Sequence, residues 1–159
     1  ENAKKWLDGL PVTEKNSPRY MIVRANIFEK IGQQDEAINS WENLLTSTDK
    51  EEQKVRALTA LGRLHEKQGN NTEALGYYLK VLGLTEDAQV RLNAAEVAWR
   101  VKDYRKAQLL LEPIIKGRSA SKNTKIKLKA LKALGQVHEK KSEYELAFRY
   151  YSKALKIEE

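Results

Sequence analysis

One internal repeat dominates the sequence. Residues 57–84 read ALTALGRLHEKQGNNTEALGYYLKVLGL, and residues 130–157, which lie 73 positions later, read ALKALGQVHEKKSEYELAFRYYSKALKI. The two copies share alanines, leucines, one glycine and a pair of tyrosines at helical spacing, and no reactive group stands apart from this pattern. A repeat of small, apolar and aromatic residues at that spacing is typical of a packing unit, so the chain is expected to fold as a stack of similar helical units.

The order of residues within one copy resembles the tetratricopeptide repeat, whose loose pattern is W-x-x-L-G-x-x-Y, then an alanine, an aromatic residue, a small residue and a closing proline. The first copy fills these positions with Leu58, Leu61, Gly62, His65, Ala74, Tyr78, Val81 and Glu86, and the second with Leu131, Leu134, Gly135, His138, Ala147, Tyr151, Ala154 and Glu159. Histidine replaces the tyrosine, leucine replaces the tryptophan, and the closing proline is missing. The resemblance implies an all-α, right-handed superhelical solenoid of antiparallel helix pairs.

Four repeats are predicted from the alanines that mark the second helix of each pair. These alanines are Ala37, Ala74, Ala107 and Ala147, and their spacings of 37, 33 and 40 bracket the 34 residues of the family. The predicted repeats cover approximately residues 18–47, 48–84, 86–116 and 121–158. Residues 1–10 are predicted to be an orphan second helix whose partner is missing, so residues 1–159 are interpreted as one array from a longer protein.

The helix starts are predicted from capping residues. Ser17 before Pro18 is typical of an N-cap, and Asp103 is expected to cap the second helix of the third repeat. Thr48 followed by Glu51 has the spacing of a capping box, and Thr85 is expected to cap the first helix of the third repeat.

No catalytic or metal-binding constellation can be assembled from the sequence. Cysteine is absent, and His65 and His138 are the two histidines of the chain. Both occupy the same position of the repeat, which favours a packing role over that of a metal ligand or a general base. No apolar run approaches the roughly 18 residues of a membrane span. We therefore predict a non-enzymatic protein that needs no cofactor and no metal.

The family resemblance implies that the first helices of the repeats line a concave groove that grips an extended peptide or a helix of a partner. The side chains expected on this face are mostly basic, with a few apolar ones, which favours an acidic or mixed partner. They are Arg19, Ile22, Asn26, Lys30, Arg56, Thr59, Arg63, Lys67, Gln89, Leu92, Glu96, Trp99, Arg100, Lys129, Lys132, Gln136 and Lys140.

Trp99 is the most informative of these residues, because helical periodicity places it opposite the apolar stripe of its own helix. It is either an anchor for the partner or a residue packed against a neighbouring helix. The family members that clamp the C-terminal carboxylate of chaperones use a set of lysines, asparagines and arginine. This chain matches that set at Asn93 and Lys129 alone, so a chaperone clamp is not predicted.

Two further interactions are considered. Between Lys116 and Lys141 nine basic residues face one acid, Glu139, within a chain of net charge +7. This region is the basis of an alternative function, binding of an anionic polymer such as nucleic acid or polysaccharide, or of a lipid surface. The last helix is also expected to expose an apolar side made of Leu146, Tyr150, Ala154 and Ile157, which predicts self-association through an end of the array.

Overall fold

The computed structural model describes residues 5, 9, 16–116 and 122–158. These residues form helices, turns and short connections, and no strand occurs among them. The helices are α3 (Pro18–Lys30), α4 (Gln34–Ser47), α5 (Glu51–Lys67), α6 (Asn71–Leu82), α7 (Ala88–Arg100), α8 (Tyr104–Ile115), α9 (Thr124–Lys140) and α10 (Tyr144–Glu158). The predicted all-α fold is confirmed. The predicted orphan helix at residues 1–10 lies outside the described residues, apart from Lys5 and Gly9.

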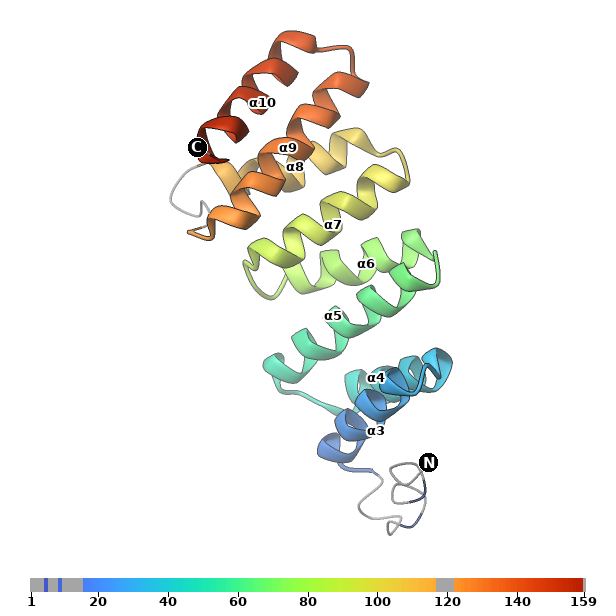
Figure 1. Cartoon of the computed structure of the whole chain (residues 1–159). Helices are drawn as coiled ribbons and strands as arrows, with labels where there is room; N and C mark the ends of the chain where they lie inside the picture. Colours follow the sequence, from blue (N-terminus) through green and yellow to red (C-terminus); the bar gives the residue numbers. More distant parts are fainter. Residues whose placement is uncertain (1–4, 6–8, 10–15, 117–121, 159) are drawn as a thin grey trace.

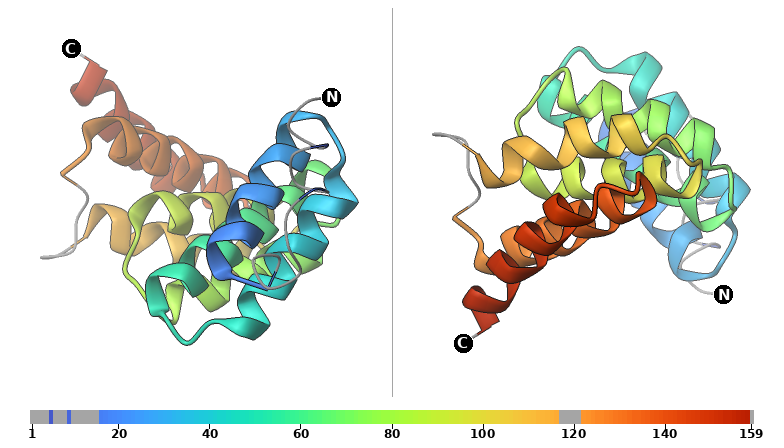
Figure 2. Two further views of the ribbon diagram at one scale, coloured as in Figure 1. Left: turned by 90° about the horizontal axis from the view of Figure 1, so that it is seen from below. Right: turned by 90° about the horizontal axis from the view of Figure 1, so that it is seen from above.

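The helices stack in chain order into an elongated array (Figure 1). Each first helix (α3, α5, α7, α9) packs against the second helix that follows it (α4, α6, α8, α10), and each second helix packs against the first helix of the next pair. Seen along the stack, successive pairs are rotated rather than superimposed (Figure 2). We call the four pairs repeats one to four.

The marker alanines are buried at the contacts between helices. Ala37, Ala74, Ala107 and Ala147 are all almost fully covered. A methyl group at this position lets the two helices of a pair approach closely, and the larger side chain four residues later fills the space toward the next repeat. Trp41, Tyr78 and Leu111 occupy that second position and are buried, whereas Tyr151 in the last repeat is half-buried.

The glycine of the repeat has a specific steric role. A Cβ atom at Gly62 would lie 2.7 Å from Cε1 of Tyr78, and a Cβ at Gly135 would overlap the ring of Tyr151 in the same way. The tyrosine ring of each second helix therefore rests on the bare backbone of the first helix. This contact explains why both copies of the sequence repeat keep a glycine in mid-helix, where glycine is otherwise unfavourable by about 1 kcal/mol.

Side-chain caps confirm two of the predicted helix starts and correct two others. The hydroxyl of Ser17 accepts a hydrogen bond from the amide of Tyr20, and Asp103 caps α8 through the amide of Lys106. Thr48 is instead a buried residue at the end of α4, and α5 begins only at Glu51. The cap of α7 is Asp87 rather than Thr85, with its carboxylate 2.7 Å from the amide of Gln89.

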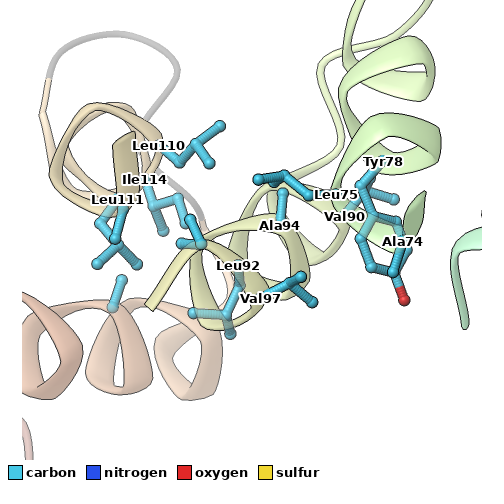
Figure 3. Close-up of a cluster of buried hydrophobic side chains, with 14 of the residues drawn as sticks. Ala74, Leu75, Tyr78, Val90, Leu92, Ala94, Val97, Leu110, Leu111 and Ile114 are labelled. Carbon is cyan, nitrogen blue, oxygen red and sulfur yellow. The ribbon is translucent and has the colours of Figure 1, made fainter. Parts of the chain in front are cut away.

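The apolar core has two parts. The first is formed by α3, α4 and α5, and the second extends from α5 and α6 to α9. Figure 3 shows the centre of the second part, where apolar side chains of α6, α7 and α8 lie together, with α7 in the middle. Leu45 and Tyr77 contact both parts, so the core is continuous along the array. None of the described helices is long and apolar enough to cross a membrane.

Candidate functional site

Acidic residues of the first helices connect successive repeats. The carboxylate of Glu29 on α3 accepts a hydrogen bond from Nε1 of Trp41 on α4, at 2.9 Å, and forms an ion pair with Arg63 on α5. Glu66 on α5 makes the equivalent contacts one repeat later. It accepts from the hydroxyl of Tyr78 at 2.9 Å and pairs with Nη1 of Arg100 on α7 at 2.6 Å.

Each of these acids therefore joins the two helices of its own repeat and the first helix of the next one. Burial, together with the hydrogen bond to Glu66, raises the pKa of Tyr78 well above its usual value. The neutral hydroxyl of Tyr78 is consequently the stable form, and it acts as the hydrogen-bond donor in this contact.

Repeat three departs from this arrangement. The position of Glu29 and Glu66 is held by Trp99, and the aromatic position of the second helix is held by Leu111. Repeat four returns to the pattern, because Glu139 accepts a hydrogen bond from the hydroxyl of Tyr151 at 2.9 Å. A polar contact between carboxylate and aromatic side chain is thus replaced in repeat three by two apolar side chains.

A cavity of about 210 Å³ opens where the arrangement changes. Its walls come from α7, α8 and α9, and four of its lining residues, Ala95, Ala107, Leu111 and Val137, are buried. The complete lining is Ala95, Glu96, Trp99, Arg100, Ala107, Leu111, Ala133, Gln136 and Val137. We refer to this space as the apolar cavity.

A second hollow adjoins the apolar cavity at Arg100. It is lined by Arg63, Glu66, Lys67, Gly69, Asn71 and Arg100, which place three cations against one carboxylate. Lys67 has no ion-pair partner among the described residues, whereas the two arginines pair with Glu29 and Glu66. We refer to this surface as the basic hollow.

The two spaces bring together six of the groove residues predicted from the sequence. Arg63, Lys67 and Arg100 line the basic hollow, and Glu96, Trp99 and Gln136 join Arg100 around the apolar cavity. The remaining predicted residues line neither space. They are Arg19, Ile22, Asn26, Lys30, Arg56, Thr59, Gln89, Leu92, Lys129, Lys132 and Lys140.

Several of these residues have contacts within the protein. The guanidinium of Arg56 lies 5.7 Å from the centre of the Trp41 ring, and the hydroxyl of Thr59 donates to the carbonyl of Val55 at 2.7 Å. Lys132 pairs with Glu158 on α10 at 2.6 Å.

The prediction for Leu92 is wrong. Its side chain is 0% exposed and belongs to the core, so it cannot contact a partner in the groove. The reason is that α7 packs against three helices, α6, α8 and α9. The contact with α9 covers a side of α7 that would be exposed if α7 packed only against α6 and α8.

Trp99 has a packing contact within the protein, and its role as an anchor for a partner stays a prediction. Its ring is half-buried against the core, with its centre 4.9 Å from that of Tyr104 on α8, and it also lines the apolar cavity. Trp99 therefore supports the packing of repeat three while it borders the candidate site.

The prediction of the exposed face of α10 is wrong for two of its four residues. Ala154 is buried, and Tyr150 packs against the core. Leu146 is exposed as predicted, at 40%, and Ile157 is half-buried. The most exposed apolar side chains of α10 are Tyr144, Phe148 and Leu155, at 67%, 72% and 60%. They recur at intervals of four and seven residues and thus form one stripe. In repeat two the positions of Phe148 and Leu155 are held by Leu75 and Leu82, which pack in the core near α7.

The histidines have the packing role predicted for them. His65 stacks on Tyr77 and His138 stacks on Tyr150, with ring centres 5.2 Å and 5.1 Å apart. Among the described residues, no group of three or more histidine, aspartate or glutamate side chains is arranged to hold a metal ion.

Sequence reasoning missed Glu29 and Glu66, which connect the repeats. The signal is present in the sequence, because each acid precedes an aromatic residue by 12 positions and an arginine by 34 positions. It also missed the apolar lining, whose residues come from three helices and share no local pattern.

The comparisons with known proteins agree with this architecture. Two family models, both described as tetratricopeptide repeat, match residues 57–92 and 128–159. A search of curated proteins finds no significant match.

Several solved structures share the fold at low sequence identity. The structure described as "Crystal structure of MamA" has a TM-score of 0.80 at 20% identity, over 98% of this chain and 84% of that chain. BtubC from P. vanneervenii has a TM-score of 0.68 at 16% identity, over 98% of this chain and 68% of that chain. YrrB, described as "a TPR protein with an unusual peptide-binding site", has a TM-score of 0.61 at 15% identity, over 99% of this chain and 92% of that chain.

Proposed function

We propose that this chain, which contains tetratricopeptide repeats in an all-α solenoid, is a non-catalytic scaffold that holds an acidic or mixed peptide segment of another protein along its first helices. The tetratricopeptide fold implies a role in protein–protein interaction. The finer proposal concerns the place and the chemistry of binding. The segment lies across α5, α7 and α9, over the basic hollow and the apolar cavity.

The observation that carries this proposal is the junction of the two spaces at Arg100. A cavity with a buried apolar floor and a hollow with three cations share one wall. Binding sites combine apolar contact area with a small number of well-placed polar groups, and this junction offers both. A neutral or basic segment would leave the cations of the hollow without new partners.

The arginines of the hollow remain available to a partner. The side chains of Arg63 and Arg100 are each 44% exposed, although both are paired with a glutamate. A guanidinium has five N–H donors, so the contact with one carboxylate leaves donors free for a second one. The glutamates thus hold the arginines in a fixed orientation. The arginine side chains therefore lose less conformational entropy when a partner's carboxylate binds.

The alternative function, binding of an anionic polymer through Lys116 to Lys141, is not favoured. Three of the described cations of this region are already paired, Lys116 with Glu112, Lys132 with Glu158 and Lys141 with Glu143. Polymer binding depends on many unpaired cations along one surface, because each neutralised phosphate contributes to affinity by releasing counterions.

A displayed library of random 12-residue peptides provides the test. Peptides that bind the wild-type protein are expected to be enriched in aspartate and glutamate. Lys67→Glu should weaken the selected peptides about five- to tenfold, which corresponds to ~1 kcal/mol. Arg105→Glu makes the same charge change at an exposed position of the second helix α8 and is the matched control, with affinity expected to stay unchanged.

Salt distinguishes this function from polymer binding. Affinity for the selected peptides should fall modestly with salt, whereas binding to a nucleic acid should fall with a log–log slope near −0.9 per phosphate contact. The proposal fails if the library yields no binders, or if Lys67→Glu and Arg105→Glu have equal effects.

A further inference from the structure

We propose that the apolar cavity between α7, α8 and α9 receives one apolar side chain of the bound segment, and that an acidic side chain next to this anchor pairs with Arg100 and Lys67. This inference rests on the proposed function and specifies its ligand. The partner segment therefore carries an aliphatic or aromatic residue with an aspartate or glutamate close to it in sequence. Neither the fold nor the family models assign such a pocket.

The cavity arises from three differences between repeat three and its neighbours. In repeats two and four a tyrosine ring rests on a glycine and donates to a glutamate. In repeat three the corresponding residues are Leu111, Ala95 and Trp99, and all three line the cavity. Leucine is shorter than tyrosine and cannot donate a hydrogen bond, so the space that the tyrosine fills in repeats two and four is left open.

The floor of the cavity is apolar and held in place by its surroundings. Ala107, Leu111 and Val137 are at most 1% exposed and come from two different helices, α8 and α9. An apolar cavity of about 150 Å³ is large enough to hold a benzene-sized molecule. The 210 Å³ present here can therefore hold the side chain of leucine, methionine or phenylalanine. A polar side chain would lose its hydration without gaining a partner on this floor.

The charges around the cavity determine where the acid of the partner lies. Arg100 belongs to both spaces, and Lys67 and Arg63 lie beyond it on α5. The remaining polar residues of the cavity, Glu96 and Gln136, add no positive charge. An acid adjacent to the anchor is thus attracted toward α5, and this fixes the orientation of the segment across the first helices.

The decisive variant rebuilds in repeat three the arrangement of repeat two. The triple variant Ala95→Gly, Trp99→Glu and Leu111→Tyr introduces the residues that repeats two and four already accommodate, and it places a tyrosine ring in the cavity. The probes are peptides selected on the wild-type protein, each with its set of single-alanine variants. The matched control is Leu109→Tyr, which makes the same substitution at an exposed position of α8.

The expected results are specific to an anchor. In each selected peptide, replacement of one apolar residue by alanine should weaken binding to the wild-type protein at least tenfold. The triple variant should bind the parent peptide at least tenfold more weakly, and it should no longer distinguish the parent peptide from the alanine variant. Titration of the wild-type protein with the parent peptide should change its tryptophan fluorescence, because Trp99 lines the cavity. The Leu109→Tyr control should behave as the wild type does.

A second variant covers the case in which the triple variant does not fold. Ala133→Leu places a larger side chain in the wall of the cavity from a half-buried position of α9 and is expected to give the same loss of binding. If the filled variants bind the parent peptide as tightly as the wild type, the pocket is refuted while the proposed function stands. If no library peptide binds the wild-type protein, both proposals are refuted.

Discussion

Replacement of Gly62 by alanine tests the contact between the glycine and the tyrosine ring. In a helix interior, alanine is more favourable than glycine by about 0.5–1 kcal/mol. Local propensity alone therefore predicts that Gly62→Ala stabilises the protein. The structure predicts the opposite sign, because the new Cβ would lie 2.7 Å and 2.8 Å from two carbons of the Tyr78 ring.

The magnitude follows from the surroundings of that ring. Carbon atoms in contact prefer separations of about 3.5–4.0 Å, so the ring would have to move by close to 1 Å. Tyr78 is 1% exposed and its hydroxyl is held by Glu66, which leaves it little room to move. Overpacking of this kind costs about 1–3 kcal/mol. After the gain in propensity, we expect a net loss of about 1–2 kcal/mol, or ~3–6 °C in Tm for a domain of this size.

Thermal unfolding followed by circular dichroism measures this effect, and two further variants serve as controls. Gly76 lies inside α6 with no atom within 4 Å of its added Cβ, so Gly76→Ala should raise Tm. In a Tyr78→Leu background, Gly62→Ala should also be stabilising. The two substitutions together reproduce the pair found in repeat three, where Ala95 and Leu111 hold these positions. The difference between the effects of Gly62→Ala on stability in the two backgrounds measures the coupling between positions 62 and 78. A rise in Tm for Gly62→Ala in the wild-type background would refute the steric argument.

Three other predictions concern titration, packing and assembly. Because the folded pKa of Tyr78 is raised, its contribution to stability is complete below the unfolded pKa of about 10 and is lost as the pH rises above it. Tyr78→Phe should therefore lose less stability than the wild type between pH 9 and pH 11 in urea titrations, and equal losses would contradict this. Trp99→Ala should lower the free energy of unfolding by about 1–2 kcal/mol, because a half-buried ring that packs on Tyr104 is removed. An unchanged Tm would show that the ring contributes no packing. Phe148→Ser should reduce self-association in sedimentation experiments, since Phe148 is 72% exposed in the apolar stripe of α10. A wild-type protein that is monomeric at high concentration would exclude this mode of assembly.

The sequence alone predicts the all-α fold, and the reason is that the repeat pattern is local. The alanine at Ala74, the aromatic residue at Tyr78 and the glycine at Gly62 recur at positions set by the 3.6-residue period of the helix. In repeats two and four the tyrosine of the second helix meets the glycine and the glutamate of the first helix in the same way, so one copy of the pattern predicts these contacts of the other. The same argument predicts the packing role of His65 and His138, which stack on tyrosines in equivalent positions.

Only the tertiary structure determines where repeat three differs from its neighbours. Helical periodicity places Leu92 and Trp99 on the side of α7 opposite its apolar stripe, and it carries no information about a third neighbouring helix. The packing of α9 against α7 buries Leu92 completely and leaves Trp99 at the edge of a cavity. The contacts of Glu66 with Tyr78 and Arg100 likewise join three helices. The period of a helix is set by its own backbone, but the covering of each face depends on the angle and distance at which the next helices pack.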